Sequence, residues 1–280
     1  MKRASREPLV DWQQVHDSDF RVPAEVALSD LTEELTIMLG DPDPGRRDET
    51  AYPTLAAWVS RGVYDDLLPG LGDGMVAGLA SGLGEVGTDS VFRRSFSALV
   101  LAECIARDNA RPLVLGGKVL QWGDALATWV LREQDLRGHV AGKGWAHAVA
   151  HGADALAALA SSPHLARPEL TVVLDVVADR LLAPVDAVWA HGEADRLVGT
   201  TLAVLRRGQV PLTVLEPWVN RVAADAGPSV EARSANAQAF LRGLYLQLAI
   251  GSRPPSVRAD LMLVLVGVLR STNPGFQHPH

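Results

Sequence analysis

The chain has 280 residues, of which 48% are hydrophobic, so it is long enough to bury a sizeable core. Its formal net charge is −7 and its arginines form only isolated pairs such as Arg206–Arg207, which excludes the basic stripe expected of a nucleic-acid-binding protein and disfavours binding to an anionic membrane surface. Cys104 is the single cysteine, which excludes an intramolecular disulfide, and its apolar, helically spaced neighbours predict a buried core position.

The two ends of the chain carry no targeting or membrane-spanning pattern. The first twenty residues lack the apolar core of a signal peptide. The longest apolar run, LMLVLVGVL at 261–269, is far shorter than the roughly 20 residues needed to cross a bilayer. We therefore expect a soluble, cytoplasmic protein, with a flexible N-terminal extension at 1–22 and a flexible tail at 272–280.

Helical periodicity begins near the N-terminus and continues along the chain. Leucines recur every three or four residues from Leu28 to Leu39, which predicts a helix that ends before Pro42. Two short apolar runs, at 173–177 and 210–215, are the best strand candidates. Neither is paired with a second run through a hairpin turn, so both are predicted to be helical.

Five segments share one layout: each opens with polar residues, becomes apolar and ends near a glycine or a charge. They begin at Asp48, Asp89, Gly142, Gly192 and Ser234. A second apolar helix is expected after each of them, at 65–83, 112–132, 168–183, 210–226 and 255–270. The spacing is close to the roughly 40–47-residue period of HEAT or armadillo repeats.

This layout predicts an all-α fold over residues 1–280. The expected architecture is one domain, a HEAT/armadillo-like helical-repeat solenoid of about five helix pairs plus an N-terminal helix. An irregular all-helical globule is the alternative, because the five segments share a layout without sharing residue identities.

Several segments also resemble a known family. LGDPDPGRRDETAYPTLAAWV, VFRRSFSAL, GKGWAHAVAHGAD, HGEADRL and FLRGLYLQL occur in this order between Leu28 and Leu269. Together they resemble the bacterial family catalogued as domain of unknown function 2785, with GKGWAHAVAHGAD as the most specific element. The resemblance implies a soluble helical protein built as one unit, and it implies no activity and no catalytic residues.

The segment 135–154, DLRGHVAGKGWAHAVAHGAD, gathers more potentially reactive side chains than any other part of the sequence. His147 and His151 are four residues apart, and Asp154 is three residues further on. If the segment begins a helix, all three side chains lie on one face. They are therefore the candidate catalytic residues.

One interpretation of this face is a divalent metal site. Two histidines four residues apart can bind zinc, manganese or iron, and Asp154 can act as a third ligand or can orient His151. His191 or Glu193 can complete such a set. The general-base glutamate of the HExxH zinc motif is missing between His147 and His151.

Two interpretations without a metal stay open. Asp154 can hold His151 in one tautomer for acid–base chemistry, although no convincing nucleophile accompanies the pair. Alternatively, the histidines form hydrogen bonds between neighbouring helices and Trp145 fills space in the core. The sequence does not separate these two possibilities from a metal site.

The expected start of this helix suggests an anion site. Free backbone N–H groups at Gly142-Lys143-Gly144, with Lys143 beside them and Arg137 close in sequence, can attract an anion. A capping turn with a solvated lysine is the alternative. Trp145 and Trp189 each precede a histidine by two residues and are the tryptophans most expected to line a groove.

Polar residues also stand at the starts of the first helices in other units. If these helices stack in parallel, the polar residues meet on one surface and form a groove. The predicted ligand-binding residues are Arg137, Lys143, Trp145, Tyr52, Arg93, Arg94, His191, Glu193 and Asn236.

The leading functional prediction is a protein that binds a small polar molecule or a peptide in a concave groove centred on GKGWAHAVAHGAD. The first alternative is an enzyme that uses His147, His151 and Asp154 for metal-assisted hydrolysis or for acid–base chemistry. The second alternative is a protein–protein interaction scaffold.

Overall fold

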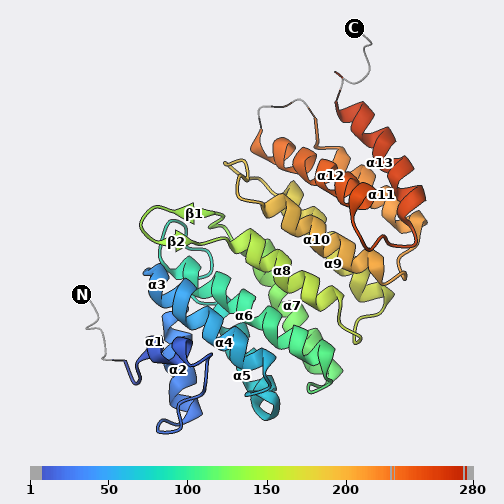
Figure 1. The fold of residues 1–280 in the computed structure, drawn as a ribbon. Helices are drawn as coiled ribbons and strands as arrows, with labels where there is room; N and C mark the ends of the chain where they lie inside the picture. The colour runs from blue at the N-terminus through green and yellow to red at the C-terminus, as the bar shows by residue number, and fades with distance from the viewer. Residues whose placement is uncertain (1–7, 228, 230, 274, 276–280) are drawn as a thin grey trace.

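The computed structural model describes residues 8–273 and 275, except 228 and 230, and this part of the chain is almost entirely α-helical (Figure 1). Helices α1 (Trp12–Asp17) and α2 (Leu28–Met38) precede five helix pairs among the described residues. The pairs are α4 (Tyr52–Ser60) with α5 (Leu68–Leu79), α6 (Ser90–Ala110) with α7 (Gly116–Arg132), α8 (Ala148–Ala160) with α9 (Arg167–Leu182), α10 (Glu193–Arg206) with α11 (Leu212–Ala223), and α12 (Ala232–Ile250) with α13 (Arg258–Thr272). The prediction of an all-α fold is confirmed.

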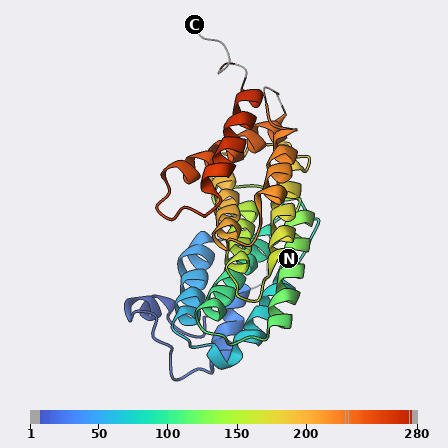
Figure 2. The same ribbon diagram turned by 90° about the vertical axis from the view of Figure 1, so that its right-hand side faces the viewer.

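The helix pairs form two layers. The first helices pack side by side in the order α4, α6, α8, α10, α12, and the second helices pack in the order α5, α7, α9, α11, α13. Figure 2 shows the pairs following one another from the blue N-terminal end to the red C-terminal end. Each pair thereby buries its apolar face on its neighbours, which gives the stack its stability.

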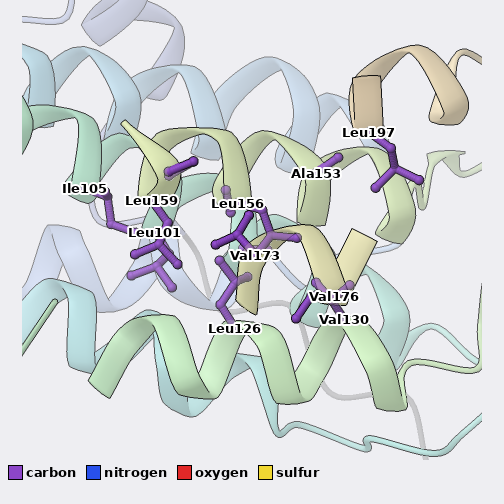
Figure 3. Packing of buried hydrophobic residues seen from close by; sticks show 14 of the residues in the cluster. Leu101, Ile105, Leu126, Val130, Ala153, Leu156, Leu159, Val173, Val176 and Leu197 are labelled. Atoms are coloured by element: carbon purple, nitrogen blue, oxygen red, sulfur yellow. The ribbon is translucent and has the colours of Figure 1, made fainter. Parts of the chain in front are cut away.

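The core fills the space between the two layers. Leu101 of α6, Leu126 of α7, Leu156 of α8, Val173 of α9 and Leu197 of α10 are all buried, and Figure 3 shows several of these side chains meeting between the helices. Burial of one such leucine stabilises the fold by about 1.5–3 kcal/mol. The same apolar periodicity that predicts the helices therefore also places the core.

The ends of the described chain belong to the same core. Trp12 and Val15 of α1 join one cluster of buried residues that continues to Val268 of α13. The N-terminal extension that was expected to be flexible therefore contains a packed helix in its described part, whereas residues 1–7 and most of the predicted tail lie outside the described residues. Cys104 is buried, as predicted. No helix among the described residues is long and apolar enough to span a membrane.

The chain between α2 and α4 forms two short helical turns. Asp43 accepts a hydrogen bond from the Gly45 N–H (2.9 Å) and caps the short helix α3 (Pro44–Arg46). Pro44 stands in the first turn of α3, where its missing N–H needs no partner. A π-helical turn, η1 (Arg47–Ala51), then leads directly into α4.

The largest departure from the prediction lies between α7 and α8. The runs at 173–177 and 210–215 belong largely to α9 and α11, so their helical prediction is confirmed. The helix predicted to begin at Gly142 is wrong over its first residues. Here the chain forms a short antiparallel hairpin of β1 (His139–Val140) and β2 (Gly144–Trp145).

Candidate functional site

The hairpin replaces the first turns of the predicted helix because two glycines bend the backbone. Gly142 and Gly144 have φ values of +73° and +77°, a region that L side chains rarely adopt. The Lys143 N–H donates to the Val140 carbonyl (2.9 Å) across the turn. The anion site predicted at a helix N-terminus is therefore wrong, because Gly142–Gly144 begin no helix. The Lys143 ammonium instead pairs with Asp89 (2.6 Å).

His147, His151 and Asp154 do not share one helix face. His147 immediately precedes α8 and has φ +51°, so its backbone is not helical and its side chain does not project from the helix. His151 and Asp154 are three residues apart within α8. The one-face prediction is wrong, because it requires His147 to be helical.

The hairpin is pinned to the first helix pair by Arg47. This side chain is fully buried, and its Nη2 donates to the Lys143 carbonyl (2.6 Å) while its Nη1 donates to the Asp41 carbonyl (2.6 Å). Its Nε lies 2.7 Å from the Asp48 carboxylate, and its guanidinium lies over the Phe92 ring at 4.0 Å. The position of the hairpin therefore depends on a residue 96 positions earlier in the chain.

Four histidines and one tryptophan gather beside the hairpin, and we call them the histidine cluster: His139, His147, His151, His191 and Trp145. Trp145 stacks on His147 (ring centroids 4.6 Å apart) and meets His139 and His191 edge-on at 5.0 and 5.3 Å. His151 contacts His147 edge-on at 5.7 Å. Four of the five members are predicted site residues, and the fifth, His139, is brought beside Trp145 by the hairpin.

His147 lies closest to a charged group within the cluster. Its Nε2 lies 3.2 Å from the His191 carbonyl and 3.7 Å from the Glu193 carboxylate. Burial lowers the pKa of His147 more than Glu193 raises it. The imidazole is therefore predominantly neutral at neutral pH.

His151 lies deeper in the structure. Its ring meets Phe96 edge-on at 4.9 Å, and its Nδ1 is buried without a hydrogen-bond partner among the described residues. Burial, reinforced by the neighbouring His147, lowers the pKa of His151 to about 3. This imidazole is neutral across the physiological range and is too weak a base to accept a proton there.

Asp154 does not orient His151 but pairs with the next helix. Its two carboxylate oxygens accept from Nη1 of Arg196 in α10 (2.9 and 2.7 Å). Among the described residues, no group of three or more His, Cys, Asp or Glu side chains is arranged to hold a metal ion. A zinc, manganese or iron site at His147, His151 and Asp154 therefore gains no support from this geometry.

Two arginines predicted to line a groove are instead structural. Arg94 is fully buried and its Nε and Nη2 donate to the Glu133 carboxylate (2.5 and 2.9 Å). Arg93 donates to the Thr36 carbonyl. Both guanidiniums tie helix α6 to neighbouring segments, so neither is presented to a ligand.

Two more predicted groove residues hold other segments in place. Asn236 accepts from the Trp189 N–H (2.8 Å) and so fixes the loop between α9 and α10. The Tyr52 hydroxyl donates to Glu103 (2.9 Å) on the surface where α4 meets α6. Burial, followed by the charge of Glu103, raises the pKa of Tyr52 above its usual range.

A pocket of about 740 Å³ lies where three loops meet: α5–α6, α7–β1 and α9–α10. Its walls include the apolar side chains of Leu83 and Leu136 and the polar side chains of Arg137, Arg180 and Trp189. Arg137 and Trp189 were predicted to line a groove, and both line this pocket. Arg180 was missed, because from the sequence it reads as one more charge at the end of an apolar helix.

Arg180 is the most unusual charged group of the pocket. Arg180 is only 4% exposed, and its Nη1 donates to the carbonyls of Val130 (3.3 Å) and Glu133 (3.0 Å). Its Nε has no hydrogen-bond partner among the described residues. Burial lowers the pKa of Arg180, although the Glu133 charge opposes this effect.

Comparison with protein families identifies one match. Residues 79–246 match the family model described as "Protein of unknown function (DUF2785)". This range covers more than half of the chain and contains the hairpin, the histidine cluster and every residue that lines the pocket. No curated protein and no solved structure matches the chain significantly.

Proposed function

The chain belongs to the DUF2785 family, whose description names no activity, and we propose from the geometry of its site that it binds a small polar molecule in the pocket beside the hairpin. We propose further that the two helix layers form a HEAT- or armadillo-like solenoid whose inter-helix loops build this pocket. The pocket volume of about 740 Å³ lies within the range of small-molecule sites, which favours a small ligand over a peptide.

A single observation carries this proposal: the pocket contains a buried guanidinium with an unused donor. Unpaired buried polar groups cost about 1–3 kcal/mol each, so proteins rarely keep them without a partner. A ligand that accepts from Arg180 removes this cost. The apolar walls supplied by Leu83 and Leu136 add contact area for the rest of the ligand.

The test compares two matched tryptophan substitutions in the α9–α10 loop. Ala187 lines the pocket and is exposed, so Ala187→Trp fills the space without disturbing the core. Val188 is the next residue, is 56% exposed and does not line the pocket, so Val188→Trp is the control. A collection of small polar metabolites is screened by thermal shift, and each hit is measured by calorimetry.

We expect hits that raise the melting temperature of the wild type and of Val188→Trp but not of Ala187→Trp. Hits that bind all three proteins equally would place the ligand elsewhere. A screen in which no small molecule binds would favour an interaction scaffold instead.

A second candidate function is acid–base chemistry at His147. His147 is a non-glycine residue held at φ +51°, and such backbone strain is often found at functional sites. Its neutral imidazole lies 3.7 Å from Glu193, which can stabilise the protonated form during a proton transfer. The test is hydrolysis of p-nitrophenyl esters, with His147→Gln compared with His139→Gln, which removes a cluster member that lacks the carboxylate. Loss of turnover in His147→Gln alone would support this chemistry, and equal rates would exclude it for these substrates.

A further inference from the structure

The position of Arg180 gives the pocket its charge. It stands in the last turn of α9 and reaches the C-terminal end of α7, where the carbonyls of Val130 and Glu133 accept from Nη1. Helix C-terminal carbonyls carry partial negative charge and suit a cation. They are not a counter-ion, and Arg180 forms no ion pair with a carboxylate in the described part of the chain.

The carboxylates near Arg180 are already engaged. Glu133 accepts from Arg94, from the Trp129 indole (2.9 Å) and from the Asp135 N–H (2.9 Å). Asp135 accepts from two nitrogens of Arg137 (2.7 and 2.6 Å). Because each of these two carboxylates already faces its own arginine, Arg180 has no carboxylate of its own among the described residues, although the charge of Glu133 acts on it from nearby.

A second donor without an acceptor belongs to the same pocket. The Trp189 indole Nε1 is buried and has no hydrogen-bond partner among the described residues. Its backbone N–H donates to Asn236, which fixes the position of the Trp189 backbone beside the pocket. Arg132, an exposed residue at the pocket rim, adds a further positive charge.

Apolar side chains supply part of the remaining lining. They are Leu83 of the α5–α6 loop, Leu131 at the end of α7 and Leu136 of the α7–β1 loop, and Leu131 is 41% exposed. Three carboxylates line the pocket: Glu133 and Asp135 already accept from arginines, and Asp186 is exposed to solvent, where its charge is screened. The pocket therefore combines a cationic, donor-rich end with an apolar body.

We propose that the ligand carries one oxyanion group, a carboxylate or a phosphate, on an apolar body, and that Arg180 binds the oxyanion with Trp189 as a second donor. This inference rests on the proposed binding function and names its ligand class. A guanidinium presents several donors in a plane and matches both oxyanions. Leu83, Leu131 and Leu136 contact the apolar part of the ligand.

The test uses three probes of similar shape on the full chain: benzoate, phenyl phosphate and the neutral benzamide. The protein is labelled with ¹⁵N, and the indole N–H signal of Trp189 is assigned by its loss in Trp189→Phe. We expect benzoate or phenyl phosphate to shift this signal saturably and benzamide to bind at least about tenfold more weakly, as expected for losing a hydrogen bond to a charged group. Comparing the affinities of benzoate and phenyl phosphate identifies the preferred oxyanion.

Arg180→Gln should weaken binding of the anionic probe by about tenfold or more and leave benzamide binding unchanged, since the neutral probe gains nothing from the charge of Arg180. Arg207→Gln is the matched control. Arg207 also donates to backbone carbonyls, those of Ala160 at the end of α8 (2.9 Å) and of Leu165 in the following loop (3.1 Å), but it does not line the pocket. Arg180→Lys retains the positive charge, so it replaces Arg180→Gln as the test if that variant does not fold. The Arg180→Lys variant should bind benzoate more tightly than benzamide.

Three outcomes overturn the inference: benzamide binds as tightly as benzoate, Arg180→Gln binds benzoate like the wild type, or Arg180→Lys loses the preference for the anion. In each of these cases a probe still occupies the pocket, so the proposed binding function stands. If no probe, charged or neutral, shifts the Trp189 signal, and the metabolite screen with Ala187→Trp is also negative, the binding function itself fails.

Discussion

Arg47 and Lys143 are joined by a hydrogen bond of 2.6 Å from a buried guanidinium to a backbone carbonyl, across 96 positions of sequence. This contact holds the hairpin against the first helix pair. Gly144 makes the approach possible, because a Cβ there would lie 3.1 Å from Nη2 of Arg47 and 3.0 Å from Pro44. The hairpin in turn places Trp145 over His147.

Arg47→Met should lower the free energy of unfolding by about 2–4 kcal/mol, because two buried carbonyls and the Asp48 carboxylate lose their donor. Urea denaturation measures the change. Arg46→Met is the matched control: Arg46 is adjacent, its side chain is 41% exposed, and its ion pair with Asp41 should contribute less than about 1 kcal/mol. Similar losses in the two variants would show that Arg47 does not hold the hairpin in place.

Arg94→Met should destabilise the fold by about 3 kcal/mol or more, because it leaves Glu133 buried without its cation. The double variant Arg94→Met/Glu133→Leu should recover part of this loss, since Glu133 is then no longer buried without Arg94. Thermal and urea unfolding of the two single variants and the double variant complete a double-mutant cycle. Additive losses would contradict the prediction that the two charges interact.

His147→Val should be less stable than His147→Asn by about 1 kcal/mol, because a β-branched residue disfavours φ +51° and asparagine tolerates it. The same two substitutions at His139 provide the control. His139 lies in the extended strand β1, where valine is favoured and the order of stability should reverse. The melting temperatures of the four variants check this prediction, and the same order at both positions would argue against a left-handed His147.

Stability should fall as the pH is lowered from 7 to 5, and His151 should account for much of the fall. Its pKa is lowered from 6.5 to about 3 by burial, so the unfolded chain binds the proton and the folded chain does not. The contribution of His151 is fully present above pH 6.5 and is lost as the pH falls towards 3. Between pH 6.5 and pH 5 the loss amounts to about 2 kcal/mol.

The measurement is urea unfolding at pH 7 and pH 5 for the wild type and for His151→Leu, which keeps an apolar side chain of similar size in the buried site. The difference in stability between the two pH values should shrink in the variant. Two neighbouring groups are unchanged in this comparison: His147, whose pKa burial also lowers, and Asp154, whose pKa burial raises. An unchanged difference would show that other groups control the acid sensitivity.

Much of the helical scaffold can be predicted from the sequence. The leucines from Leu28 onward predict α2, and the polar opening at Gly192 predicts the start of α10, because an apolar stripe every three or four residues is a property of each segment alone. The two strand-like runs at 173–177 and 210–215 are also correctly predicted to be helical, since neither has a partner strand in the sequence. GKGWAHAVAHGAD, the most specific segment of the family resemblance, lies within residues 79–246, which match the family model.

The candidate site is predicted only in part. His147, His191, Trp145 and Trp189 are found from the sequence because tryptophan and histidine are rare enough to stand out. Arg180 is not predicted as a site residue, because a charge at the end of a helix is an ordinary feature of a solvated surface. Its burial follows from the packing of α9 on α7, which no local pattern encodes.

The sequence by itself determines where the helices lie and which faces they bury, because backbone propensity and apolar periodicity act over a few residues. Only the tertiary structure decides that residues 139–145 form a hairpin, that Asp154 pairs with Arg196, and that Arg180 is buried in the lining of a pocket. The physical reason is distance along the chain. The contact between Arg47 and Lys143 joins residues 96 positions apart, and a pattern that spans a few residues does not encode it.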